Sequence, residues 1–162
     1  MTLREFVESA SEKIGELFDQ TGQILPMYHI VLGTENIIMP APPVPKDIAV
    51  NIMRDVFAKA GVHRYVFIDE AWLATEEAPI GATISHMQER MKTAIPPSER
   101  PDRTECVIFF AEDETEGFFS GRRMITRDAD GKGTLGPLEC DMQPDVVVGR
   151  MTGLLPVKGR MQ

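Results

Sequence analysis

Apolar side chains recur every three or four residues along the first twenty-one positions of the chain. This spacing puts them on one side of a helix: Leu3, Phe6, Val7, Ala10, Ile14, Leu17 and Phe18. Thr2 and Glu5 have the spacing of a capping box at the start, and Thr21 and Gly22 provide an end. The opposite side is rich in glutamate, so the pattern predicts an amphipathic helix with an acidic, solvated face.

The next apolar segments have the composition of β-strands. Residues 23–32 and 36–40 are rich in β-branched and other apolar residues, and Gly33 lies in the turn between them, which predicts a β-hairpin. Residues 63–74 are apolar at both odd and even positions. A strand of this kind is covered on both faces, so the segment is predicted to be a central strand.

A second helix is predicted between the hairpin and the central strand. Pro45 suits the first helical position, and Gly61 suits the position just after the last turn. The predicted buried stripe consists of the larger apolar residues at helical spacing: Ile48, Ile52, Met53, Val56, Phe57 and Ala60.

The segment 75–103 contains four prolines around a polar middle, yet it keeps some helical spacing of apolar residues. A third amphipathic helix and a mobile flap are both compatible with this pattern. Three further strands follow, at residues 105–111, 118–126 and 134–140. The predicted fold class is therefore α+β, with a mixed or mainly antiparallel sheet of five to six strands and two or three amphipathic helices packed on it.

Length, charge and cysteine content limit the function classes. A chain of 162 residues predicts one domain, here residues 1–145 with a C-terminal tail at 146–162. The net charge of −8 argues against nucleic acid as a partner. No segment has the length and apolarity of a membrane span or the order of a signal peptide, which predicts a cytoplasmic protein with no membrane partner. Two cysteines at unrelated positions and three histidines suggest no cofactor.

A sequence that is close to a calcium-binding loop lies at residues 128–139. Asp128, Asp130 and Glu139 fall on ligand positions of the EF-hand pattern, but Lys132 stands where an oxygen ligand is needed. The flanks read as strands, which favours a hairpin turn between them over a calcium site. The three carboxylates are kept as metal-ligand candidates.

Catalytic candidates are few. Asp69 and Glu70 lie near the end of the central strand, where one of them could act as an acid or base together with His86. Successive side chains of a regular strand point to opposite faces, so the two carboxylates are not expected to cooperate directly. A hydrolase-like enzyme using Asp69 or Glu70 with His86 is the alternative function.

The leading expectation is a non-catalytic binding or assembly protein whose partner is another protein, most simply a second copy. Methionine side chains suit adaptable contacts, and the tail is apolar and basic on an otherwise acidic chain. The expected contact residues combine these two features: Met87, Met91, Arg150, Leu154, Leu155, Lys158 and Arg160. The tail is expected to dock on its own domain or on a neighbouring subunit of a homo-oligomer.

Overall fold

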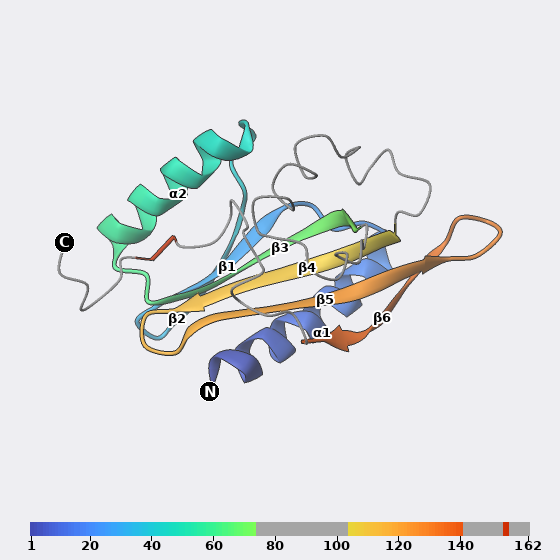
Figure 1. Ribbon diagram of the computed structural model, residues 1–162, viewed down its shortest axis with the longest axis horizontal. Helices are drawn as coiled ribbons and strands as arrows, with labels where there is room; N and C mark the ends of the chain where they lie inside the picture. The colour runs from blue at the N-terminus through green and yellow to red at the C-terminus, as the bar shows by residue number, and fades with distance from the viewer. Residues whose placement is uncertain (74–103, 141–153, 156–162) are drawn as a thin grey trace, which may run out of the picture.

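The computed structural model describes residues 1–73, 104–140 and 154–155. Within these residues six strands form one sheet in the order β2-β1-β3-β4-β5-β6, and every neighbouring pair is antiparallel (Figure 1). The strands are β1 (Met27–Leu32), β2 (Glu35–Pro40), β3 (Arg64–Leu73), β4 (Thr104–Asp113), β5 (Gly117–Arg127) and β6 (Gly133–Glu139). The predicted α+β class, the hairpin and the later strands are confirmed.

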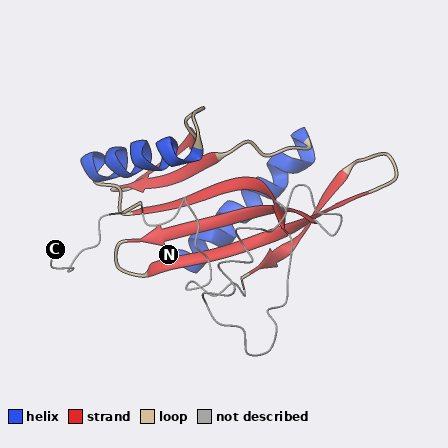
Figure 2. Cartoon of the chain, turned by 45° about the horizontal axis from the view of Figure 1, so that its top comes forward, coloured by secondary structure: helices blue, strands red, loops and turns tan. Residues whose placement is uncertain are grey.

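Helix α1 (Leu3–Thr21) begins as predicted. The Thr2 hydroxyl accepts a hydrogen bond from the backbone N–H of Glu5, and the Glu5 carboxylate accepts one from the N–H of Thr2. Gly22 ends the helix in the left-handed conformation, with φ of 74°, which glycine adopts without a steric cost. Figure 2 shows α1 behind the strands, on the side of the sheet opposite to α2 (Lys46–Ala60).

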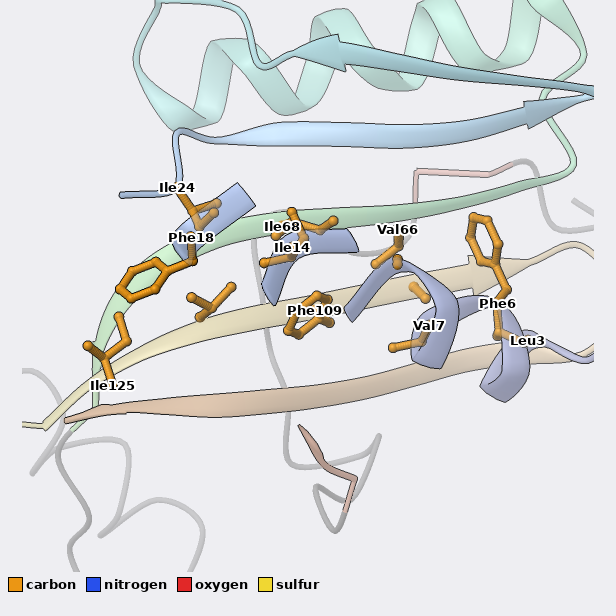
Figure 3. Packing of buried hydrophobic residues seen from close by; sticks show 13 residues of the cluster. Leu3, Phe6, Val7, Ile14, Phe18, Ile24, Val66, Ile68, Phe109 and Ile125 are labelled. Carbon is orange, nitrogen blue, oxygen red and sulfur yellow. The ribbon is translucent and has the colours of Figure 1, made fainter. Parts of the chain in front are cut away.

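The first hydrophobic cluster lies between α1 and the sheet. Phe6, Ile14 and Phe18 of α1 point toward residues such as Val66, Ile68 and Phe109 of the central strands (Figure 3). Each of these side chains is almost completely excluded from water. The predicted apolar stripe of α1 is therefore the face that stabilises this layer, and burying each large side chain contributes about 2 kcal/mol.

The second hydrophobic cluster lies on the other face of the sheet, beneath α2. Tyr28 of β1 and Tyr65 and Phe67 of β3 provide the sheet side, and Met53 and Phe57 provide the helix side. Residues 65 to 68 of β3 alternate between the two clusters and are all buried. This confirms the prediction of a central strand that is covered on both faces.

The predicted buried stripe of α2 was wrong in its rotation. Met53 and Phe57 are buried, but the other buried residues are the small Ala49 and Val50. The remaining predicted core residues are exposed: Ile48, Ile52, Val56 and Ala60. The helix also begins at Lys46 with Pro45 as its N-cap, one residue later than predicted. The rings of Tyr28 and Tyr65 contact Phe57, and the rotation that buries Phe57 and Met53 also buries Ala49 and Val50.

Candidate functional site

A hollow of about 290 Å³ lies at the C-terminal end of β3. Its lining combines carboxylates with one tryptophan and aliphatic groups: Ile24, Asp69, Glu70, Ala71, Trp72, Glu105 and Ile125. Asp69 and Glu70, two of the predicted catalytic residues, both border this hollow, but their side chains lie on opposite faces of β3. The third, His86, lies outside the described residues.

Asp69 lies on the α2 side of β3, since its register partner Ile108 packs against the second cluster. Partial burial raises the pKa of Asp69 to about 6, although the nearby Lys46 ammonium opposes the shift. A carboxyl group with this pKa is ionised in part near neutral pH and can give or accept a proton there. This carboxyl group lies on the opposite face of the sheet from Ile24 and Ile125, which belong to the first cluster on the α1 side.

The other carboxylates of the hollow are used in structural contacts. Glu70 accepts a hydrogen bond of 2.9 Å from the backbone N–H of Ile24 and so fixes the segment that follows α1. Glu105 forms an ion pair of 2.5 Å with Arg127. In the part of the chain that the structure describes, neither a histidine nor a cysteine lines this hollow. Among the described lining residues, the carboxyl group with a raised pKa and the carboxylate of Glu70 therefore do not share one face of the sheet.

Asp69→Asn is expected to raise the free energy of unfolding at pH 7.5 by about 1 kcal/mol and to have little effect at pH 4. The folded pKa lies above the ordinary value of 3.8. Ionisation therefore costs folding free energy as the pH rises from about 4 to 6, and the neutral amide avoids that cost. Urea denaturation at both pH values measures the difference.

Glu70→Gln is the control, because it weakens the hydrogen bond to Ile24 and should destabilise the protein at both pH values. An equal effect of Asp69→Asn at both pH values would contradict the assignment.

The calcium-like sequence forms the turn between β5 and β6, so the hairpin interpretation is confirmed. The Asp128 carboxylate accepts hydrogen bonds of 2.9 Å from the backbone N–H groups of Asp130 and Lys132. Glu139 lies at the far end of β6, where it forms an ion pair with Arg122. Six strand residues separate it from the turn, a length of about 20 Å. Among the described residues, no group of three metal-ligating side chains comes together.

An exposed apolar surface, which the sequence analysis missed, lies along one flank of α2. Ile48, Ile52 and Val56 succeed one another at intervals of four residues and are 51%, 41% and 39% exposed. Val44, just before the helix, is also 39% exposed. The signal was present in the sequence. The apolar residues of α2 span about 200° of the helix, whereas a helix that buries one face needs little more than about 100°.

We infer from the chain topology that the exposed flank of α2 is turned toward the side of the sheet that ends in β2. Strands β2 and β3 run parallel, with β1 between them, and α2 connects β2 to β3. The connection between two parallel strands of one sheet is right-handed in nearly all proteins. With this hand and about 100° of rotation per residue, the flank with Ile52 turns toward the β2 edge. Ile37 of β2 lies on the same face, since its partner Ile30 belongs to the second cluster. We call Ile37, Val44, Ile48, Ile52 and Val56 the α2–β2 surface.

The α2–β2 surface is electrically neutral on a chain whose net charge is −8. Residues 35–60 contain equal numbers of basic and acidic side chains: Lys46, Arg54 and Lys59 against Glu35, Asp47 and Asp55. Asp55 and Lys59 form an ion pair of 2.9 Å on the helix itself. In contrast, α1 has an excess of acidic residues, with five against the two basic residues Arg4 and Lys13. The apolar surface thus repels a negatively charged neighbour less than the acidic face of α1 does.

Two of the predicted contact residues of the tail are described, and both are buried in the second cluster. Leu154 is fully buried and Leu155 is nearly so. Their backbone N–H groups donate to Oε2 of Glu112 over 3.1 and 3.5 Å, and the Tyr65 hydroxyl donates to the same oxygen over 2.9 Å. One β4 carboxylate therefore joins the tail to the sheet. The other predicted contacts lie outside the described residues: Met87, Met91, Arg150, Lys158 and Arg160.

Comparisons with known proteins give no further assignment of this chain. No protein-family model, no curated protein and no solved structure matches it. Neither of the described helices has the length and apolarity of a membrane-spanning helix.

Proposed function

We propose that this protein is a non-catalytic assembly protein whose α2–β2 surface binds a copy of the same chain. The observation that carries the proposal is the line of large aliphatic residues at positions 48, 52 and 56, which the protein does not use in its own core. Helix α2 is already anchored by Met53 and Phe57, so these residues are not needed to hold it. An apolar stripe beside an apolar strand is typical of an interface.

Two features support self-association over binding of a charged partner. The surface has no excess of either sign, so it offers no electrostatic attraction to a strongly acidic or basic molecule. A symmetric contact places a surface against itself, and a neutral apolar surface meets its own copy without like-charge repulsion. The acidic face of α1 lacks this property.

Replacing Ile52 and Val56 together by aspartate is expected to weaken self-association at least about 100-fold. Each aliphatic side chain contributes about 1.5 kcal/mol or more when buried in an interface, and about 1.4 kcal/mol corresponds to a tenfold change in the dissociation constant. Sedimentation velocity over a wide range of concentration measures the effect. The unchanged chain should gain mass with concentration, whereas the variant should stay monomeric and keep its thermal stability.

The matched control places the same two charges on the other flank of α2. Asn51 and Ala58 are exposed and lie away from the α2–β2 surface, so replacing both by aspartate should leave self-association intact. If the unchanged chain stays monomeric at every concentration, the proposed function is wrong. Equal loss in both double variants would show that added charge, and not the apolar surface, governs association.

A further inference from the structure

We propose that two copies join through antiparallel pairing of their β2 strands, with a two-fold axis at Ile37, to form one continuous sheet. This inference rests on the proposed function and specifies the contact. It requires that β2 present free backbone groups, that the opposite edge of the sheet be less suitable, and that the side chains on both faces be compatible with symmetry.

Strand β2 is the last strand on its side of the described sheet. Leu32 and Glu35 close its hairpin across the two turn residues Gly33 and Thr34, and Gly33 has φ of 64°. The closing pair of a two-residue hairpin is a hydrogen-bonded pair, and hydrogen-bonded pairs alternate along an antiparallel ladder. The N–H and C=O groups of residues 35, 37 and 39 therefore point to β1, and those of Asn36 and Ile38 point outward.

The opposite edge of the sheet is unsuited to the same pairing. Strand β6 contains Pro137, which has no N–H to donate, and its register with β5 is irregular between Arg123 and Ile125. Proline and irregular pairing are the devices that protect sheet edges from other chains. In β2 the only proline is Pro40, the last residue of the strand. The edge at β2 therefore keeps its outward-facing donors at Asn36 and Ile38.

A two-fold axis at Ile37 matches the donors and acceptors of the two strands. Asn36 of one copy then lies opposite Ile38 of the other, and each such pair exchanges two N–H···O hydrogen bonds. The two Ile37 side chains meet on the face that bears α2. There they extend the apolar flanks of the two α2 helices, so strand pairing and helix contact bury one continuous surface.

The neutral charge of this surface allows a second copy of the acidic chain to approach it. The strand and helix segments that meet contain equal numbers of acidic and basic residues. Glu35 is the single charged residue of β2, and in this register it lies opposite Met39 of the other copy. No like charges face each other across the paired strands. Two molecules with a net charge of −8 can therefore approach here without the repulsion that their acidic surfaces generate.

Disulfide cross-linking tests the pairing in the full-length chain. Ile37→Cys is made in a Cys140→Ser background, which removes the partly exposed native thiol and leaves the buried Cys106. Residues facing each other across the axis in a non-hydrogen-bonded pair have Cα atoms about 4.5 Å apart, within the range that a disulfide spans. Mild oxidation should convert most of the protein to a covalent dimer. The control Ala58→Cys, on the other flank of α2, should give little covalent dimer.

Ile38→Lys is the second variant, since it adds a charge to the edge and leaves pairing with β1 in place. It should lower cross-linking at position 37 at least tenfold without a change in circular dichroism. Absence of the cross-link in a protein that still gains mass with concentration would overturn β2 pairing and leave the proposed function standing. Equal cross-linking at positions 37 and 58 would overturn the pairing as well. A chain that never associates would refute both proposals.

Discussion

Phe57→Ala is expected to lower the free energy of unfolding by about 4 kcal/mol. Phe57 has no exposed surface. Its ring lies 5.0 Å from the ring of Tyr65 and 5.7 Å from that of Tyr28, measured between centroids. Truncation leaves a cavity between helix and sheet, and deletions of buried phenylalanine cost about 3–5 kcal/mol. Urea denaturation at neutral pH measures the loss.

Val56→Ala is the matched control, because it removes apolar atoms from the neighbouring residue of the same helix. Val56 is 39% exposed, so in a monomeric sample its truncation should cost about 0.5 kcal/mol or less. The sequence pattern alone placed both residues in the core. Similar losses for the two variants would show that α2 is rotated relative to the sheet and would remove the α2–β2 surface.

The sequence alone was enough to predict an element and its buried face where one apolar periodicity dominated the segment. In α1 every large apolar residue falls on one stripe and the other side is charged, so the only rotation that buries the stripe is the observed one. The strand at Arg64–Leu73 was recognisable because apolar residues occupy both of its faces. The turn at Asp128 was recognisable because aspartate and glycine have a local structural role there that needs no distant partner.

The sequence did not predict the buried face of a helix correctly where the apolar arc of that helix was wider than the surface that could cover it. Helix α2 presents isoleucines, valines and a phenylalanine around more than half of its circumference, and volume alone favoured the large residues as the core. Tertiary packing decided otherwise. Phe57 packs against the rings of Tyr28 and Tyr65, and the helix rotation that buries Phe57 leaves Ile48 and Ile52 exposed. The surplus apolar residues are the ones proposed to contact a second copy.

The candidate site depended on contacts between segments that are distant in the sequence. Glu70 and Glu105 are unremarkable acidic residues until Ile24 and Arg127 are brought against them. Likewise, the raised pKa of Asp69 comes first from burial at the end of β3, a property of the packed sheet. Sequence analysis identified the residue type and the strand end, and folding determined which carboxyl group has a perturbed pKa.

A partly buried ion-pair cluster around Arg64 joins the N-terminus to the turn between β4 and β5. The Arg64 guanidinium forms ion pairs of 2.7 Å with Asp113 and 2.6 Å with Glu116. It also donates to the backbone carbonyl of Met1 and lies 5.6 Å from the ring centroid of Phe6. Asp113 is the central member, since its other carboxylate oxygen accepts hydrogen bonds from Thr115 and from the backbone N–H of Glu116.

Asp113→Ala is expected to lower the free energy of unfolding by about 3 kcal/mol. The substitution removes one side of a buried ion pair and leaves two backbone N–H groups of the turn without their acceptor, and losses of this kind cost about 3–5 kcal/mol. The lower end applies because Arg64 keeps its contact with Glu116. Asp55→Ala is the control, since it breaks an exposed ion pair with Lys59 and should cost about 0.5 kcal/mol or less. Chemical denaturation distinguishes the two.

The same carboxylate should make the fold sensitive to acid. Burial tends to raise the pKa of Asp113, but the hydrogen bonds from Thr115, Glu116 and Arg64 outweigh it and hold the pKa far below the usual 3.8. A group with a lowered folded pKa stabilises fully above its unfolded pKa and loses this contribution as the pH falls below about 4. The unfolding free energy of the unchanged protein should therefore fall between pH 4 and pH 2, and that of Asp113→Asn should fall less steeply. Parallel pH profiles for the two proteins would show that the Arg64 cluster does not depend on the charge of Asp113.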